Sequence, residues 1–105
     1  MIGLLALLAA PITYGATDSG TFTVTRVAVS SSQILTIGTQ QAESSSGCTL
    51  HTSFRLDMAT SAVAGETLAT ALDAFTAGES LEIGFDTDAA DCVNNAPKIL
   101  WVRVY

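Results

Sequence analysis

Residues 67–85 read TLATALDAFTAGESLEIGF, and the spacing of their apolar side chains changes at Gly78. Before this glycine, the larger apolar residues recur at the three- and four-residue spacing of an amphipathic helix. They are Leu68, Leu72 and Phe75. After it, apolar residues alternate with polar residues or glycine through residues 81–86, which is the period of a strand. The stretch predicts a helix over residues 62–77 that Gly78 ends and that leads into a strand.

Three further strands are predicted upstream of this helix. Residues 21–30 alternate on one parity before Arg26 and on the other parity after it, which indicates a β-bulge or a sharp bend near that residue. A run of serines then turns the chain into a second strand over residues 33–39. The third strand covers residues 48–58, where the even positions are mainly apolar and the odd positions polar. One face of this strand is expected to meet the core, and the other to meet solvent or a partner.

A last strand over residues 99–105 completes an order of three strands, one helix and two strands. This is the element order of a small OB-type barrel, a mainly β fold of five antiparallel strands with a helix between the third and fourth. Barrel closure removes most exposed strand edges, which protects so small a β domain from aggregation. We therefore expect a single OB-like β-barrel domain over residues 16–105.

Residues 1–15 are predicted to be a signal peptide that is cut near Gly15. The apolar run over residues 2–10 is too short for a transmembrane helix, which needs about 20 apolar residues, and small residues follow it where a signal peptidase could cut. No Lys or Arg precedes the run, so the true start could lie upstream. The alternative is that the run stays in the protein as a short core or docking helix. Export predicts a secreted or periplasmic bacterial protein with no membrane span in its mature chain.

Two cysteines, Cys48 and Cys92, are the only ones in the chain. In an oxidising compartment an even cysteine count indicates a disulfide, and here only one pairing is possible. With 49% hydrophobic and 13% charged residues, the composition is that of a folded domain. The net charge of −6 argues against nucleic acid and anionic membrane surfaces as partners.

The sequence offers little sign of catalysis or of a cofactor. Three acidic residues, Asp86, Asp88 and Asp91, could offer oxygen ligands to Ca²⁺, but their spacing matches no EF-hand loop, which favours an ordinary solvated loop. No set of acid, base and nucleophile can be assembled, so an enzyme is not expected. Neither a metal nor another cofactor is predicted.

The third strand carries two candidate contact residues, His51 and Arg55. Both lie at odd positions of the predicted strand, together with Asp57, and so on its polar face. A catalytic histidine would need a second base or a nucleophile that the sequence does not identify. We interpret His51 as a surface histidine beside an ion pair, available for contact with a partner.

The last strand carries the main candidate binding residues. If Leu100, Val102 and Val104 face the interior, the other parity projects outward as one row. The outward residues are Ile99, Trp101, Arg103 and Tyr105. Trp, Tyr and Arg are enriched at binding hot spots, and an aromatic face suits the apolar face of a sugar while Arg satisfies hydroxyl groups. The alternatives are that Trp101 is a core residue with the parity reversed, or that the row packs under the helix or the leader.

This arrangement resembles the small secreted OB-fold B subunits of AB-type bacterial toxins, which form pentameric rings that bind cell-surface glycans. The resemblance rests on the leader, the element order, and the helix over residues 67–77 that runs into a strand over residues 80–85. It implies that the helix lines a central pore and that edge strands pair between subunits, at residues 81–85 or at the first strands. It carries over no glycan-binding residue, and a toxin role implies an A-subunit partner.

Two functions from different classes follow from these patterns. The first is a non-catalytic binding module, oligomeric, that contacts a glycan or another protein through the exposed last strand. The second is a structural or envelope assembly subunit without a small-molecule ligand, whose strand edges mediate contacts.

Overall fold

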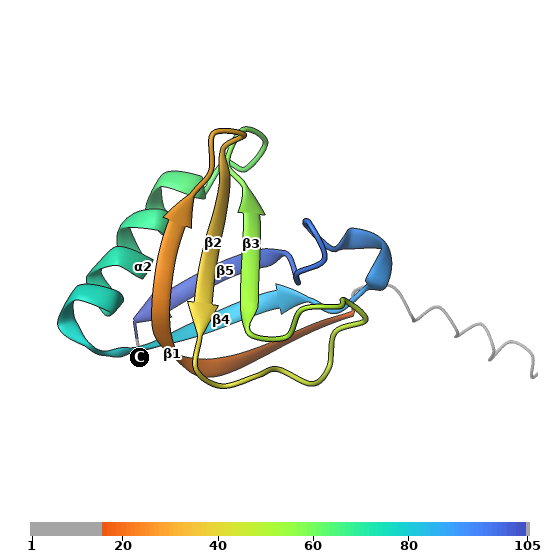
Figure 1. Ribbon diagram of the computed structural model, residues 1–105, viewed down its shortest axis with the longest axis horizontal. Helices are drawn as coiled ribbons and strands as arrows, with labels where there is room; N and C mark the ends of the chain where they lie inside the picture. Colours follow the sequence, from red (N-terminus) through yellow and green to blue (C-terminus); the bar gives the residue numbers. More distant parts are fainter. Residues whose placement is uncertain (1–15, 105) are drawn as a thin grey trace, which may run out of the picture.

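The computed structural model describes residues 16–104, so the predicted signal peptide and Tyr105 lie outside the described residues (Figure 1). The elements, in chain order, are β1 (Thr17–Val29), β2 (Ile34–Thr39), β3 (Ser53–Asp57), α2 (Ala64–Ala77), β4 (Ser80–Asp86), the short 3₁₀ helix η2 (Ala89–Asp91) and β5 (Ile99–Val104). The fold is mainly β with α2 between the third and fourth strands, as predicted. None of the helices within residues 16–104 is long and apolar enough to cross a membrane.

The five strands form one antiparallel sheet of order β3-β2-β1-β4-β5, with the long β1 at its centre. The first half of β1 pairs with β4 and the second half with β2. Between Val24 and Arg26 the register with β2 shifts, which confirms the bulge predicted near Arg26. Figure 1 shows β1 curving at this region, so that β2 and β3 cross β4 and β5 at a steep angle.

The two outermost strands, β3 and β5, approach each other at one place. Arg55 and Lys98 form an isolated parallel bridge, and the Arg55 backbone N–H donates to Pro97 O at 3.0 Å. The pairing does not continue as a ladder in the described part of the chain, so the sheet is not closed. Strands β3 and β5 remain its edges.

Apolar side chains from both halves of the bent sheet meet in one core. Three rings, Phe22, Phe54 and Phe85, come from three different strands, and their centroids lie 4.8 to 6.5 Å apart in tilted or edge arrangements. Fully buried aliphatic residues surround them: Leu35, Ile37, Leu81, Ile83 and Ile99. The core therefore depends on the alternation that the sequence displays in β3 and β4, and on the apolar residues of β2.

Helix α2 packs Leu68 against the core as predicted, but its buried face is otherwise not the one that its largest apolar residues predict. The buried residues are Ala64, Thr67, Ala71 and Ala74. Small side chains let the helix lie close to the sheet, so Leu72 and Phe75 fall on its flank and stay 43% and 47% exposed. The helix begins at Ala64 and ends as predicted at Gly78, whose φ of 69° is the left-handed conformation that favours glycine.

The third strand is shorter than the predicted range of residues 48–58. Only Ser53–Asp57 pairs with β2, because the preceding segment bonds elsewhere. The Leu50 N–H donates to Asn95 O at 2.8 Å, and the predicted Cys48–Cys92 disulfide ties the same segment to the loop before β5. Residues 48–52 therefore form part of a cross-linked loop instead of a strand.

Candidate functional site

Strands β1, β4 and β5 present a continuous outer face, directed away from the core. Two rows cross all three strands, because residues directly opposite each other in a sheet share a face. One row is Thr21, Glu82 and Arg103, and the other is Ser19, Gly84 and Trp101. We use the term outer face for these six residues.

The predicted parity of the last strand holds from Trp101 to Val104 and fails at Ile99. Trp101 is 41% exposed and Arg103 projects beside it, both on the outer face. Ile99 is buried, contrary to the prediction, because a bulge at Leu100 lets Ile99 pair with Phe85. Val104 lies opposite the buried Leu81, on the inner face as predicted, and is 42% exposed at the end of the strand. Tyr105, the remaining member of the predicted row, lies outside the described residues.

The indole ring of Trp101 lies directly on Gly84. A Cβ atom at position 84 would collide with Cε2 and Nε1 of Trp101, so only glycine leaves room for the ring to rest on the sheet. The glycine itself is buried as a result. The seat fixes Trp101 as a flat aromatic surface with one side toward the sheet.

Arg103 lies beside this ring and is paired with Glu82. Its guanidinium carbon is 5.5 Å from the Trp101 ring centroid, within cation–π range. Its Nε and Nη2 donate to Glu82 Oε1 at 3.0 and 2.6 Å. Because Glu82 balances the positive charge, the outer face offers an aromatic plane with hydrogen-bonding groups at its rim and little net charge.

The structure does not bring His51 and Arg55 to this face. His51 precedes β3, so the predicted shared strand face of His51 and Arg55 is wrong. Arg55 lies opposite Thr36 and donates from Nε to its hydroxyl at 3.2 Å, and from Nη1 to Asn94 O at 2.6 Å. These contacts tie β3 to the turn before β5, so two donors of Arg55 are engaged within the fold.

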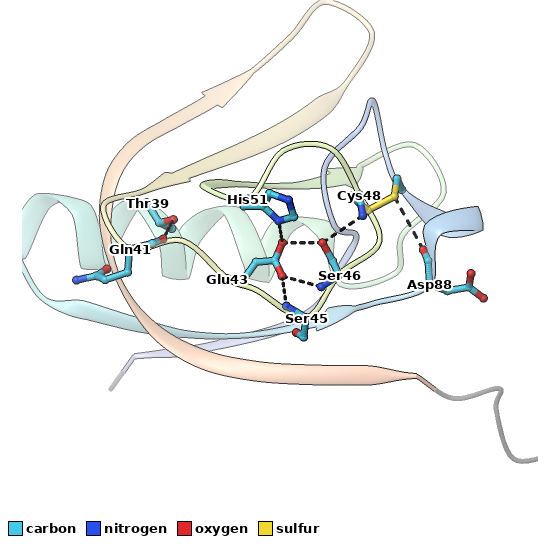
Figure 2. A network of polar contacts seen from close by, with 9 residues as sticks. Thr39, Gln41, Glu43, Ser45, Ser46, Cys48, His51 and Asp88 are labelled. Atoms are coloured by element: carbon cyan, nitrogen blue, oxygen red, sulfur yellow. Dashed lines mark hydrogen bonds and ion pairs between the residues drawn. A yellow bond between two sulfur atoms is a disulfide. The ribbon is translucent and has the colours of Figure 1, made fainter.

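A buried carboxylate, Glu43, organises the loop that carries His51 (Figure 2). The Glu43 side chain is 2% exposed and accepts hydrogen bonds from Ser45 N, from Ser46 N and Oγ, and from His51 Nδ1, at 2.6 to 3.0 Å. Burial raises the pKa of Glu43, but the hydrogen bonds from Ser46, His51 and Ser45 outweigh it and leave the pKa below its ordinary value. Glu43 is the residue that the sequence analysis missed.

This Glu43 network holds the loop together and does not form a catalytic triad. The Ser46 hydroxyl donates to Glu43, not to His51, so Ser46 and His51 are not arranged as a nucleophile and its base. Gly47 N donates to Thr87 O, and Cys48 is bonded to Cys92, which fixes the loop against the segment that follows β4. The pattern that could have revealed it is a lone glutamate followed at two and three positions by serine, since such residues bond locally in turns.

The acidic residues after β4 form a solvated cluster. Hydrogen bonding and repulsion from Asp86 raise the pKa of Asp91, which indicates crowded carboxylates. Asp88 accepts a hydrogen bond from Ala90 N and so caps η2. Over residues 16–104, no three His, Cys, Asp or Glu side chains are grouped so that they could hold a metal ion.

The outer face is therefore the part of the described chain that combines an exposed aromatic plane with polar groups free to meet a ligand. Searches of protein-family models, of curated proteins and of solved structures found no match to this chain. Its function is inferred from the geometry of the outer face.

Proposed function

We propose that this protein is a secreted or periplasmic, non-catalytic binding module that assembles as an oligomer and contacts a glycan through its outer face. The observation that carries the proposal is Trp101, which lies exposed and flat on Gly84 beside the Arg103–Glu82 pair. A protein ligand on the same face is the alternative, and the glycan experiment below distinguishes it from a glycan ligand.

The chemistry of the face suits a sugar. The C–H face of a pyranose ring can stack on Trp101, while its hydroxyl groups exchange hydrogen bonds with polar groups around the ring. Glu82 and Arg103 provide a charged acceptor and donor, and the exposed hydroxyls of Ser19 and Thr21 lie in the same two rows. A protein hot spot would need a larger apolar surface around the aromatic residue than these polar neighbours provide.

We further propose that the bent sheet is an OB-type barrel similar to the B subunits of AB-type toxins. The element order, the central β1 that pairs on both sides, and the parallel bridge between Arg55 and Lys98 support this topology. Strand β4 is bonded by β1 and β5, so it is not an edge, nor are the first two strands. Edge pairing between subunits would therefore use β3 or β5, and not residues 81–85 or the first strands as the resemblance implies.

The disulfide supports the proposed compartment. Cys48 and Cys92 are both bonded, and structural disulfides form and persist mainly in secreted and periplasmic proteins. The predicted signal peptide indicates the same secreted or periplasmic location.

The test is a glycan array probed with the full, oxidised chain and with Trp101→Ala. We expect binding to a subset of glycans and a loss of at least about tenfold in affinity for Trp101→Ala, since truncating an aromatic hot-spot residue typically costs about 2 kcal/mol or more and tenfold corresponds to about 1.4 kcal/mol. Trp101 is the only tryptophan, so its fluorescence reports binding directly. Val29→Ala is the control, because Val29 is 47% exposed at the end of β1 that pairs with β2, away from the outer face. Equal binding by Trp101→Ala and Val29→Ala, or no retained glycan, would contradict the glycan proposal.

A second function, an assembly subunit without a small ligand, is favoured by a specific observation. Leu72 and Phe75 leave an apolar flank on α2, and β3 and β5 offer unpaired edges, as subunit contacts require. Light scattering of the oxidised chain, with and without reductant, measures the mass in solution. A ring-sized particle supports an oligomer under either function, whereas a monomer at all concentrations contradicts both assembly claims.

A further inference from the structure

A groove runs beside β5, along the edge of this strand that is not paired with β3. Two cavities of about 140 and 250 Å³ lie along it and share Val63 and Leu100 in their walls. Thr67 and Thr70 of α2 line the smaller cavity, and Leu56 lines the larger. The groove therefore lies between a strand edge and a helix.

The hydrogen bonds of β4 determine which of its backbone groups face β5. Thr87 N donates to Ala16 O, so Thr87 directs its backbone groups toward the segment that begins β1. Asp86 N donates to Lys98 O, so Asp86 directs its backbone groups toward the segment that begins β5. Backbone groups alternate sides along a strand. The even-numbered residues of β4 therefore bond to β5.

The free edge of β5 follows from this alternation. Trp101 and Arg103 lie opposite even-numbered residues of β4, so their N–H and C=O groups are used within the sheet. Val102, which lines the smaller cavity, and Val104 direct theirs away from β4. Beyond the bridge at Lys98, these groups have no strand partner within residues 16–104.

We propose that an extended peptide segment of another protein binds in this groove by adding a strand to β5. Main-chain hydrogen bonds to Val102 and Val104 would hold it, as in other cases of strand addition. Alternate side chains of the peptide would point inward, about 7 Å apart, into the two adjoining cavities. This site is separate from glycan binding, although Trp101 borders the smaller cavity and so lies next to both.

The charges of the groove define the chemistry of the peptide. Glu66 lines the smaller cavity and Asp57 the larger, against one cation, Lys98, in a protein of net charge −6. Four of the residues that line the larger cavity are apolar, among them the buried Leu56 and Ile99. The segment that fits places an apolar side chain in the larger cavity and, two positions away, a Lys or Arg beside Glu66.

The experiment is a ¹⁵N NMR titration of the full, oxidised chain with two peptides, acetyl-TVTKT-amide and acetyl-TVTET-amide. We expect the lysine peptide to bind and to slow hydrogen exchange of the Val102 and Val104 amides by about tenfold or more. The Trp101 and Arg103 amides, already bonded to β4, should change little. Protection of all four amides alike, or of none, would overturn strand addition.

Two pairs of variants test the groove itself. Glu66→Lys should weaken the lysine peptide about fivefold, the upper range for an exposed ion pair, and reverse the preference toward the glutamate peptide. Asp73→Lys makes the same charge change on α2 outside the groove and should have less effect. Thr70→Phe should fill the smaller cavity and weaken binding at least about tenfold. Its matched control is Thr76→Phe, at an exposed helix position that lines neither cavity.

Two further results would overturn the proposal. The first is that each variant and its control bind the peptides equally. The second is that the Val102 and Val104 amides of the free protein become protected as its own concentration rises, because the occupant would then be a second copy of this chain. Absence of glycan binding by the wild type with intact peptide protection would contradict the proposed function and leave this inference standing, so the two failures are distinguishable.

Discussion

The outer face and the Glu43 loop are both rich in polar groups, but they use them in opposite ways. In the loop, one carboxylate accepts four hydrogen bonds from three neighbours and is almost fully buried. On the outer face, the hydroxyls of Ser19 and Thr21 make no hydrogen bond to another side chain of residues 16–104 and stay exposed. Polar groups that satisfy one another stabilise the fold, whereas polar groups left free beside an exposed ring can meet a ligand. The comparison therefore separates a structural cluster from a contact surface.

The largest expected effect comes from the bond that anchors the loop. Replacing Cys48 and Cys92 together by serine opens a ring with a sequence separation of 44, for which chain entropy gives about 4 kcal/mol of lost stability. Urea unfolding with and without reductant measures this loss. The reduced wild type should match the double variant, and glycan binding should persist wherever the variant is folded. A loss of binding in the folded variant would contradict the independence of loop and outer face.

The next effect is expected from Glu43→Ala. It leaves the amide of Ser46 and the other donors without their buried acceptor, which should cost about 3 kcal/mol, because unsatisfied buried groups bear their full desolvation penalty. Glu82→Ala, which removes the carboxylate of the outer face, should cost less than about 1 kcal/mol. Thermal or urea unfolding measures both. Equal losses would remove the distinction between the two regions.

Gly84→Ala should lower both the stability of the protein and its affinity for a glycan. The added methyl group collides with the Trp101 ring, which must leave its seat, so we expect about 2 kcal/mol of lost stability and a weaker glycan contact. Fluorescence of Trp101 should shift toward the red as the ring enters water. Gly65→Ala is the matched control, because a Cβ there meets nothing within 4 Å and should stabilise α2 by about 0.5 kcal/mol. An unshifted spectrum in Gly84→Ala would contradict the seated ring.

A smaller effect is expected from pH, because protonation weakens the Glu43 network without removing it. The pKa of Glu43 is lower in the fold than its ordinary value. The folded state therefore binds this proton less readily than the unfolded state, so the contribution is complete above the ordinary pKa and is lost as pH falls through the lower, folded value. The raised pKa of Asp91 acts in the opposite direction, so Asp91→Asn should deepen the acid loss while Glu43→Gln makes it shallower. Unfolding curves measured across the acid range provide the check.

Local patterns predicted the elements, while long-range contacts decided the sites. The alternation in β3 and β4, the bulge near Arg26 and the stop at Gly78 all lie within a few residues of sequence, so they were predictable. The face of α2 was not, because how closely a helix approaches a sheet depends on the partner that it meets. The burial of Ile99 was also missed, since a bulge one residue away reverses parity.

The candidate site shows the same division. The exposure of Trp101 and Arg103 followed from alternation, but the seat on Gly84 requires knowing that β4 and β5 are neighbours in this register. The role of Glu43 could not be predicted from the sequence for a related reason. Its partners Ser45 and Ser46 are local, yet its burial results from the disulfide and from His51, which fold the loop over it. A polar run in sequence does not reveal whether its groups face water or one another.

The smallest expected effect on stability concerns the Arg103–Glu82 pair, and it tests the outer face instead of the Glu43 loop. Arg103 has a side chain 69% exposed, and pairs of this kind contribute about 0 to 1 kcal/mol, so Arg103→Gln should change stability by no more than that. Raising the salt concentration to about 0.5 M should remove even this difference, because exposed charges are screened. Glycan affinity should fall more than stability does, since Arg103 lies over Trp101 and donates at the rim of the aromatic plane. The two quantities, measured on one protein sample by titration and by unfolding, would separate a contact residue from a structural one. A stability loss like that of Glu43→Ala, with glycan affinity unchanged, would place Arg103 in the structural class and leave Trp101 alone as the ligand contact.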